Sequence, residues 1–201
     1  DWINEQEGLY TLYLRGSENG KKVDDKRVIS SVSRCLNPYE EEGFKQMMDV
    51  AASDDLEIIV SNTTEAGIQY DPSCKQDDCP PSSFPAKLTQ VLYHRYKAGK
   101  KGIIMLACEL IDNNGKELLK CVNQYIEQWG LEEGFKKYVN EDCTFCGSLV
   151  DRIVPGRIKD ANEVAELEQK NGYADPLTDV GEVFGVWVIE GPDGLEDKLP
   201  F

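Results

Sequence analysis

The sequence predicts an α/β fold with a largely parallel sheet flanked by helices. Strand-like and helix-like segments alternate along most of the chain, which favours crossover connections between parallel strands. The run 102–108 is apolar at nearly every position, as a strand covered on both faces requires. The segment 118–129 repeats apolar residues at three- and four-residue spacing, the pattern of an amphipathic helix.

The N-terminal part predicts two strands, a helix and a third strand. Residues 9–14 alternate in polarity, residues 27–32 follow as a second strand, and the glycines in 16–20 mark a turn between them. We expect this pair to form an antiparallel edge of the sheet. Pro38 and the acidic residues after it open a helix. Residues 56–60, rich in β-branched side chains, predict the next strand.

The remaining elements continue the alternation. Pro85 fits the first turn of a helix, which leads to the buried strand 102–108. The amphipathic helix then ends at Gly130, and a shorter helix is expected after it. The last predicted elements are a strand beginning at 145, a helix over 161–170 and a strand over 183–189.

Composition excludes several classes of protein. The chain has 201 residues, 37 acidic against 22 basic side chains, and a net charge of −15. This field repels nucleic acid and anionic membranes, so we expect neither as a partner. No apolar stretch is long enough to span a bilayer. The chain begins at Asp1 and stops at Phe201 without a leader pattern, and we expect it to be an internal segment of a longer protein.

Seven cysteines and a single histidine limit the metal chemistry that the sequence offers. An odd number of cysteines in a chain of this length favours reduced thiols. One alternative is a structural zinc site that would staple a binding module. Its ligands would be Cys74, Cys79, Cys143 and Cys146. The single histidine, His94, lies on a predicted helix and is expected at its surface.

Two predicted strands end in polar loops. Ser61-Asn62-Thr63-Thr64-Glu65 follows the strand at 56–60, and a polar stretch containing Asn114 follows the strand at 102–108. Ligands of open α/β sheets bind beyond the carboxyl ends of the strands. The connection from 61 to 83 is also long for a link between a strand and a helix, as functional loops often are. Ordinary turn and capping chemistry remains the alternative for both loops.

Asp151 and Arg152 interrupt an apolar run. Burying an unpaired charged side chain costs free energy. The two residues therefore either face opposite sides of the strand or have a functional role. Arg152 is a candidate to bind the carboxylate of a substrate, because a guanidinium matches that group in two parallel hydrogen bonds.

Four segments together resemble the mannitol dehydrogenase type of polyol dehydrogenases. The tagaturonate reductase (altronate oxidoreductase) branch is the nearer match, and the resemblance covers nearly the whole chain. The segments are Ser61–Ile68, Phe84–Thr89, Val150–Pro155 and Trp187–Glu190, with Cys108–Gly115 matching the branch as well.

The resemblance implies a Rossmann-like cofactor domain and NAD-dependent, metal-independent hydride transfer between altronate and tagaturonate. On this basis Asp151 would orient the family's catalytic lysine, and Asn114 would polarise the reacting oxygen. Arg152 would bind substrate. The residues expected to border the cofactor are Ser61, Asn62, Thr63, Thr64 and Glu65.

The chain departs from the family pattern at two points. It contains neither the family's glycine-rich phosphate loop nor its lysine segment. Residues 1–201 are therefore expected to form a partial N-terminal cofactor domain, truncated at its N-terminus and without the C-terminal substrate domain. We expect such a chain to be inactive alone.

The resemblance leaves other assignments open. The same family includes fructuronate/mannonate and mannitol/fructose dehydrogenases, and the choice between NAD and NADP is undetermined. The expected partner is a small sugar acid in the cytoplasm, and no obligate protein partner is indicated. The zinc-stapled α/β binding module is the alternative from another class.

Overall fold

The computed structural model describes residues 2–200 and divides them into two compact units. Unit 1 comprises the segments up to Cys35 and from Asp151 to Val186, and unit 2 comprises 36–150 together with the segment from Trp187 onward. Asp1 and Phe201, where the sequence suggests that a longer protein is cut, lie outside the described residues.

Unit 1 is built on a four-stranded sheet in the order β2-β1-β7-β6. β1 (Tyr10–Glu18) pairs antiparallel with β2 (Lys21–Ile29). On its other side β1 runs parallel to β7 (Asp179–Glu182), which is antiparallel to the short β6 (Gly156–Arg157). Two helices belong to this unit, α1 (Trp2–Glu5) and α6 (Ala161–Asn171).

The β1–β2 hairpin turns at Asn19 and Gly20, which are the last two residues of the expected turn at 16–20. Both residues have positive φ, 52° and 75°, as a two-residue type I′ turn requires. The asparagine-glycine pair is the strongest short-range signal for this turn, so Gly16 instead lies within β1. The predicted antiparallel pair of strands is present as β1 and β2. The prediction that this pair forms an edge of the main sheet is wrong, because β1 and β2 belong to a separate sheet.

Asp175 joins three parts of unit 1 through a buried carboxylate. It accepts hydrogen bonds from the Thr11 backbone N–H (2.6 Å), from Gln6 Nε2 (3.0 Å) and from the Leu177 N–H (2.9 Å). Burial acts to raise the pKa of Asp175, but the hydrogen bonds outweigh it and hold the pKa below its ordinary value. The carboxylate thus ties β1 to the turn that precedes β7.

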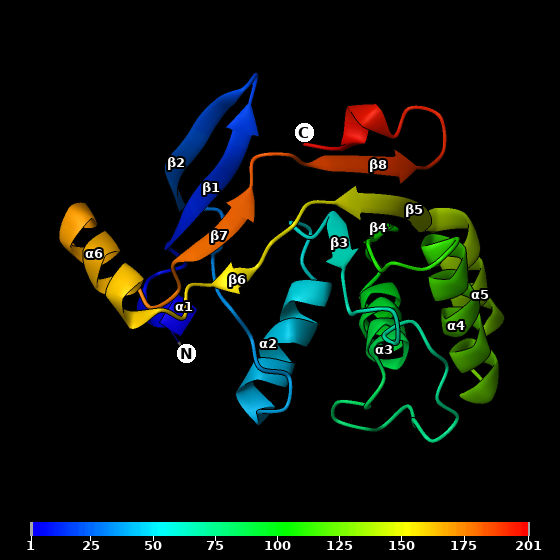
Figure 1. Ribbon diagram of the computed structural model, residues 1–201. Coiled ribbons are helices and arrows are strands. Elements are labelled where there is room, and N and C mark those ends of the chain that lie inside the picture. The colour runs from blue at the N-terminus through cyan, green and yellow to red at the C-terminus, as the bar shows by residue number, and fades with distance from the viewer. Residues whose placement is uncertain (1, 201) are drawn as a thin grey trace. The chain divides into compact units, whose positions relative to one another are not determined.

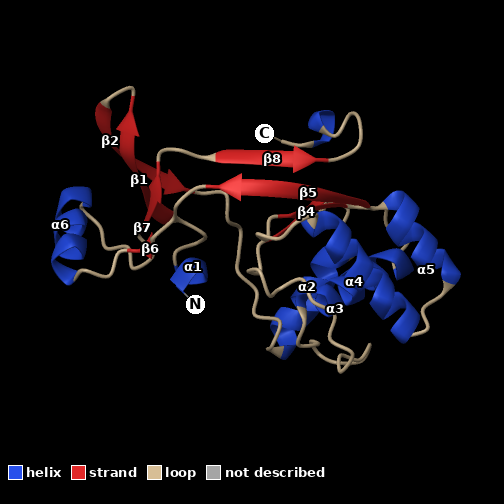
Figure 2. Ribbon diagram, turned by 45° about the vertical axis from the view of Figure 1, so that its right-hand side comes forward, coloured by secondary structure: helices blue, strands red, loops and turns tan. Residues whose placement is uncertain are grey.

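Unit 2 contains the main sheet, in the order β3-β4-β5-β8. β3 (Ile58–Ser61), β4 (Ile104–Ala107) and β5 (Thr144–Asp151) are parallel. β8 (Val186–Glu190) adds at the far side of β5, and Figures 1 and 2 show the two strands running in opposite directions. The largely parallel sheet expected from the sequence is confirmed.

The helices of unit 2 cover one face of this sheet (Figure 2). They are α2 (Glu41–Ala51), α3 (Phe84–Lys97), α4 (Asn114–Gln128) and α5 (Glu133–Lys137), which continues as a π-helical turn over Tyr138–Asp142. Ile103, Met105 and Ala107 pack against them in the larger core. On the opposite face Leu106 and Cys146 pack against Leu195, next to the 3-10 turn Glu196–Lys198. β4 is therefore covered on both sides, as its apolar sequence predicts.

No helix among residues 2–200 is both long enough and apolar enough to cross a membrane.

We predict that Asp175→Asn lowers the free energy of unfolding by about 1–3 kcal/mol at pH 7, because an amide NH₂ would face groups that donate hydrogen bonds. A carboxylate with a lowered pKa stabilises the fold above the ordinary pKa near 3.8, and this contribution is lost as the pH falls through the folded-state value. Denaturant titrations should therefore show the difference from wild type shrinking below about pH 4. The exposed Asp193→Asn is the control, and an equal deficit at pH 7 and at acid pH would contradict the role given to Asp175.

Candidate functional site at the carboxyl edge of the parallel sheet

The carboxyl ends of β3 and β4 lie side by side, and each strand leads into a polar loop. Ser61 pairs with Ala107 in the parallel register, and the N–H of Cys108 donates to the Ser61 carbonyl at 2.8 Å. The loop after β3 and the loop after β4 therefore start from neighbouring positions. This is the edge at which open α/β sheets bind ligands.

A buried carboxylate joins these two loops. Glu109 is only 1% exposed, and its Oε2 accepts a hydrogen bond from Ser61 Oγ at 3.0 Å. Its Oε1 accepts from both the backbone N–H (3.1 Å) and the Oγ1 (2.8 Å) of Thr63. The hydroxyls of Ser61 and Thr63 therefore bind this carboxylate.

The loop after β3 has a strained and closely packed shape. Thr64 has a φ of 73°, which is unusual for a β-branched residue. At Gly67 a Cβ would lie 1.9 Å from Thr63 Oγ1, so only glycine fits there. Asn62, Thr64 and Glu65 are exposed, and their side chains make no hydrogen bond within residues 2–200. An amide, a hydroxyl and a carboxylate are thus presented to solvent.

Asn114 has no donor left for a ligand in this geometry. Its Nδ2 donates to the carbonyls of Glu109 (2.9 Å) and Ser148 (2.8 Å), and its Oδ1 accepts from the N–H groups of Gly115 (2.9 Å) and Ser148 (3.0 Å). The next residue, Gly115, packs so closely that a Cβ would lie 2.5 Å from the carbonyl carbon of Cys146. The hydrogen bonds of Asn114 join the start of α4 to β5, and they use both Nδ2 donors that the expected polarising hydrogen bond to a substrate would need.

Asp151 and Arg152 lie where β5 ends. Asp151 is the last residue of β5 and is exposed. Arg152 donates from Nε to the Phe184 carbonyl (3.0 Å) and from Nη2 to the Val183 carbonyl (3.4 Å). The guanidinium lies so close to Gly185 that a Cβ there would come within 2.5 Å of Nη2. Two of the five N–H donors are therefore used, and Nη1 has no partner among residues 2–200.

The long connection after the Ser61–Gly67 loop is held on α4. The buried Tyr125 hydroxyl accepts from the Asp71 N–H (2.8 Å), donates to the Asp71 carbonyl (3.1 Å) and lies 2.8 Å from Ser83 Oγ. Burial raises the pKa of Tyr125. The connection is thus an ordered part of unit 2.

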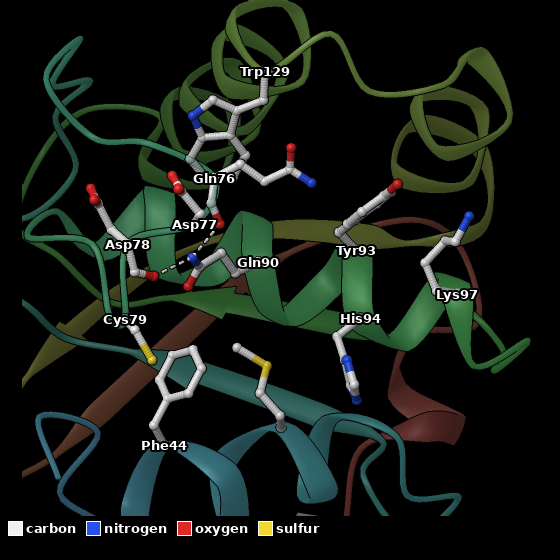
Figure 3. A pocket seen from close by; sticks show the side chains of 11 residues that line it. Phe44, Gln76, Asp77, Asp78, Cys79, Gln90, Tyr93, His94, Lys97 and Trp129 are labelled. Carbon is white, nitrogen blue, oxygen red and sulfur yellow. Dashed lines mark hydrogen bonds between the residues drawn. The ribbon is translucent and has the colours of Figure 1, made fainter. Parts of the chain in front are cut away.

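A separate hollow of about 350 Å³ lies between α2, α3 and the segment 76–79. Figure 3 shows Gln90 of α3 reaching toward that segment, where Nε2 donates to the carbonyls of Gln76 (2.8 Å) and Asp78 (2.7 Å). His94, an exposed residue as predicted, also lines it. None of the residues predicted to bind ligand lies there.

The four cysteines proposed as zinc ligands do not form a metal site. No group of three or more His, Cys, Asp or Glu side chains within residues 2–200 is arranged to hold a metal ion. Cys143 and Cys146 are buried in the core, and burial raises the pKa of both thiols. All seven cysteines are free thiols, as the sequence predicts.

The residue that sequence reasoning missed is Glu109. A charged residue directly after a buried strand was the available signal, because a buried charge must find partners. Those partners lie 46 and 48 residues away in the sequence.

The parallel sheet, its helical layer and the polar loops at its carboxyl edge define a Rossmann-type domain. The chain belongs to the mannitol dehydrogenase family, since the model of the mannitol dehydrogenase Rossmann domain matches residues 1–200.

Curated relatives match almost the entire chain. The altronate oxidoreductase of Bacillus subtilis (strain 168) is 46% identical over 203 residues, which cover 99% of this chain. The altronate oxidoreductase of Bacteroides thetaiotaomicron is 41% identical over 204 residues, or 100% of this chain. In both cases the match covers 42% of the relative, so the chain spans well under half the length of these proteins.

Solved structures share the fold at lower sequence identity. A D-sorbitol dehydrogenase in substrate-free form has a TM-score of 0.76 and 23% identity, covering 96% of this chain and 41% of that one. The mannitol 2-dehydrogenase of Pseudomonas fluorescens, in a ternary complex with NAD and D-mannitol, has the same TM-score and identity. That match covers 94% of this chain and 39% of the other.

We predict that Asn114→Ala destabilises the fold by at least about 2 kcal/mol, because two carbonyls and two N–H groups lose their partner at once. Thermal and denaturant unfolding measure this loss, with Asn62→Ala as the exposed control. An Asn114→Ala protein of wild-type stability that lost only kcat would instead support the polarising role.

Proposed function

We propose that the protein is an NAD-dependent oxidoreductase that interconverts altronate and tagaturonate by hydride transfer. The observation that carries this proposal is the 41–46% identity to altronate oxidoreductases across essentially the whole chain. Residues 1–201 then contribute part of the cofactor domain, and other segments of the complete protein supply the phosphate loop, the lysine and the substrate domain.

The chemistry of the Ser61–Gly67 loop fits a dinucleotide. Asn62, Thr64 and Glu65 leave donors and acceptors unused at the carboxyl edge of the sheet, where ribose hydroxyls require both. NAD supplies the nicotinamide carbon that accepts or gives the hydride. In this proposal Asn62, Thr64 and Glu65 bind and orient the ligand, whereas Ser61 and Thr63 act through the fixed shape of the loop.

Asp151 and Arg152 have separate proposed tasks. Asp151 ends β5 as an exposed carboxylate, and it would orient the catalytic lysine of the family and tune that lysine's proton affinity. Arg152 keeps its Nη1 donors free within residues 2–200, and these would bind the carboxylate of a sugar acid.

The proposal is tested by assaying the purified full-length protein with NADH and tagaturonate. Parallel reactions with fructuronate, with fructose and with NADPH separate the alternatives within the family. The highest kcat/KM is expected for tagaturonate with NADH, and a higher value for either other substrate would reassign it. The 201-residue chain alone is expected to be inactive, because it contains no Gly-x-Gly-x-x-Gly loop.

We predict that Glu65→Gln in the full-length enzyme lowers kcat/KM by an amount equivalent to about 1–3 kcal/mol, through lost hydrogen bonds to the ligand. The melting temperature without ligand should stay unchanged, because the exposed Glu65 side chain makes no hydrogen bond or ion pair within residues 2–200. Glu117→Gln on the surface of α4 is the matched control. Unaltered kcat/KM for both sugar acid and NADH would remove Glu65 from the binding site.

We predict that Asp151→Asn lowers kcat by about 10²-fold or more while leaving the melting temperature almost unchanged. The substitution is nearly isosteric and removes only the charge that would act on the lysine. Steady-state kinetics and thermal unfolding are measured together, with the exposed Asp49→Asn as control. A readily unfolding protein that keeps its kcat would make Asp151 a structural residue.

A further inference from the structure

Glu109 is a buried carboxylate with no cationic partner in the part of the chain that the structure describes. It is 1% exposed, and no ion pair within residues 2–200 includes it. A buried charge is costly unless hydrogen bonds compensate it. The compensation here comes from Ser61 and Thr63, so the side chain depends on the loop after β3 as much as the loop depends on it.

The hydrogen bonds of Glu109 determine which side chains of the loop face solvent. Ser61 and Thr63 donate to the two carboxylate oxygens, whereas Asn62 between them is exposed. In extended backbone, residues i and i+2 share one side and residue i+1 takes the other. Holding Ser61 and Thr63 therefore turns Asn62 outward.

The same contacts support a backbone shape that the loop would not keep by itself. Thr64, directly after the second bonded residue, has a φ of 73°. A β-branched residue in this region is strained and keeps the conformation only where its surroundings enforce it. Glu109 bonds Thr63 on one side, and the tight contact with Gly67 confines it on the other.

We propose that Glu109 is the positioning residue of the cofactor site, holding the Ser61–Gly67 loop in the shape that binds the dinucleotide. This role rests on the proposed function. It requires no contact between Glu109 and the ligand, and it depends on hydrogen-bonding geometry rather than on negative charge.

Two variants of similar size separate geometry from charge. Glu109→Gln keeps an acceptor for both Thr63 donors, and its NH₂ group can donate to the Ser61 hydroxyl. Glu109→Met keeps the volume but removes all three hydrogen bonds. In the full-length protein we expect Glu109→Met to raise the Kd and the KM for NADH about tenfold, with a smaller effect on kcat. Glu109→Gln should stay close to wild type in both constants.

Hydrogen exchange provides a readout that does not depend on NADH. The Thr63 amide and its neighbours should exchange faster in Glu109→Met than in wild type, and near the wild-type rate in Glu109→Gln. Glu117→Met on α4 is the matched control, because the Glu117 side chain makes a surface ion pair with Lys120, a kind of contact that adds little stability. This control should leave the exchange of the loop and the Kd for NADH unchanged.

Each contrary outcome has a distinct meaning. Glu109→Gln as impaired as Glu109→Met would make charge the important property and overturn the geometric role. Faster loop exchange in Glu109→Met with an unchanged Kd for NADH would overturn the positioning role alone. Wild-type protein that fails to bind NADH would refute the proposed function, and the positioning role with it.

Discussion

Unit 2 depends on the burial of β4 on every side. Its backbone pairs with β3 on one edge and with β5 on the other, and its side chains alternate between two apolar layers. Such a strand has no water on either face, so a polar side chain that is still buried just beyond its end must find partners inside the protein. Glu109 is such a residue. The hydrogen bonds that join the two polar loops therefore start at Glu109, just after the buried strand β4.

The start of α4 shows how the same constraint shapes a helix. Asn114 uses all four hydrogen-bonding positions of its amide to join the Glu109 carbonyl to β5, and Gly115 allows the helix backbone to approach β5 closely. The contact between α4 and β5 needs both residues. Asn114 makes the hydrogen bonds, and Gly115 has no side chain that would clash with β5. The loop on the β3 side has a similar pair, with Glu109 supplying the bonds and Gly67 the space.

Local sequence patterns predicted the individual helices and strands better than they predicted which strands pair in a sheet. The apolar strand at β4 and the amphipathic helix at α4 follow directly from side-chain periodicity, and both are confirmed. β7 was not predicted, because Asp179–Glu182 has few strand-forming residues and becomes a strand only between β1 and β6. This pairing also removes the N-terminal hairpin from the main sheet. The Ser61–Glu65 loop was identified by its polarity, but Glu109 was not, since its partners are distant in sequence. The hydrogen bonds of Asn114 to Ser148 were not predicted either, because the sequence alone did not place β5 beside this residue.

The cysteines divide between the two units in a way that has a practical use. Cys35 in unit 1 and Cys79 in unit 2 are the exposed thiols, whereas Cys74, Cys121, Cys143 and Cys146 are buried and Cys108 is half-buried with a pKa raised by burial. Thiolate character and access govern the reaction of cysteine with alkylating reagents. Each unit therefore has one natural attachment point for a spectroscopic label. A pair of fluorophores on these two sulfur atoms would follow the separation of the units in solution without any engineered cysteine.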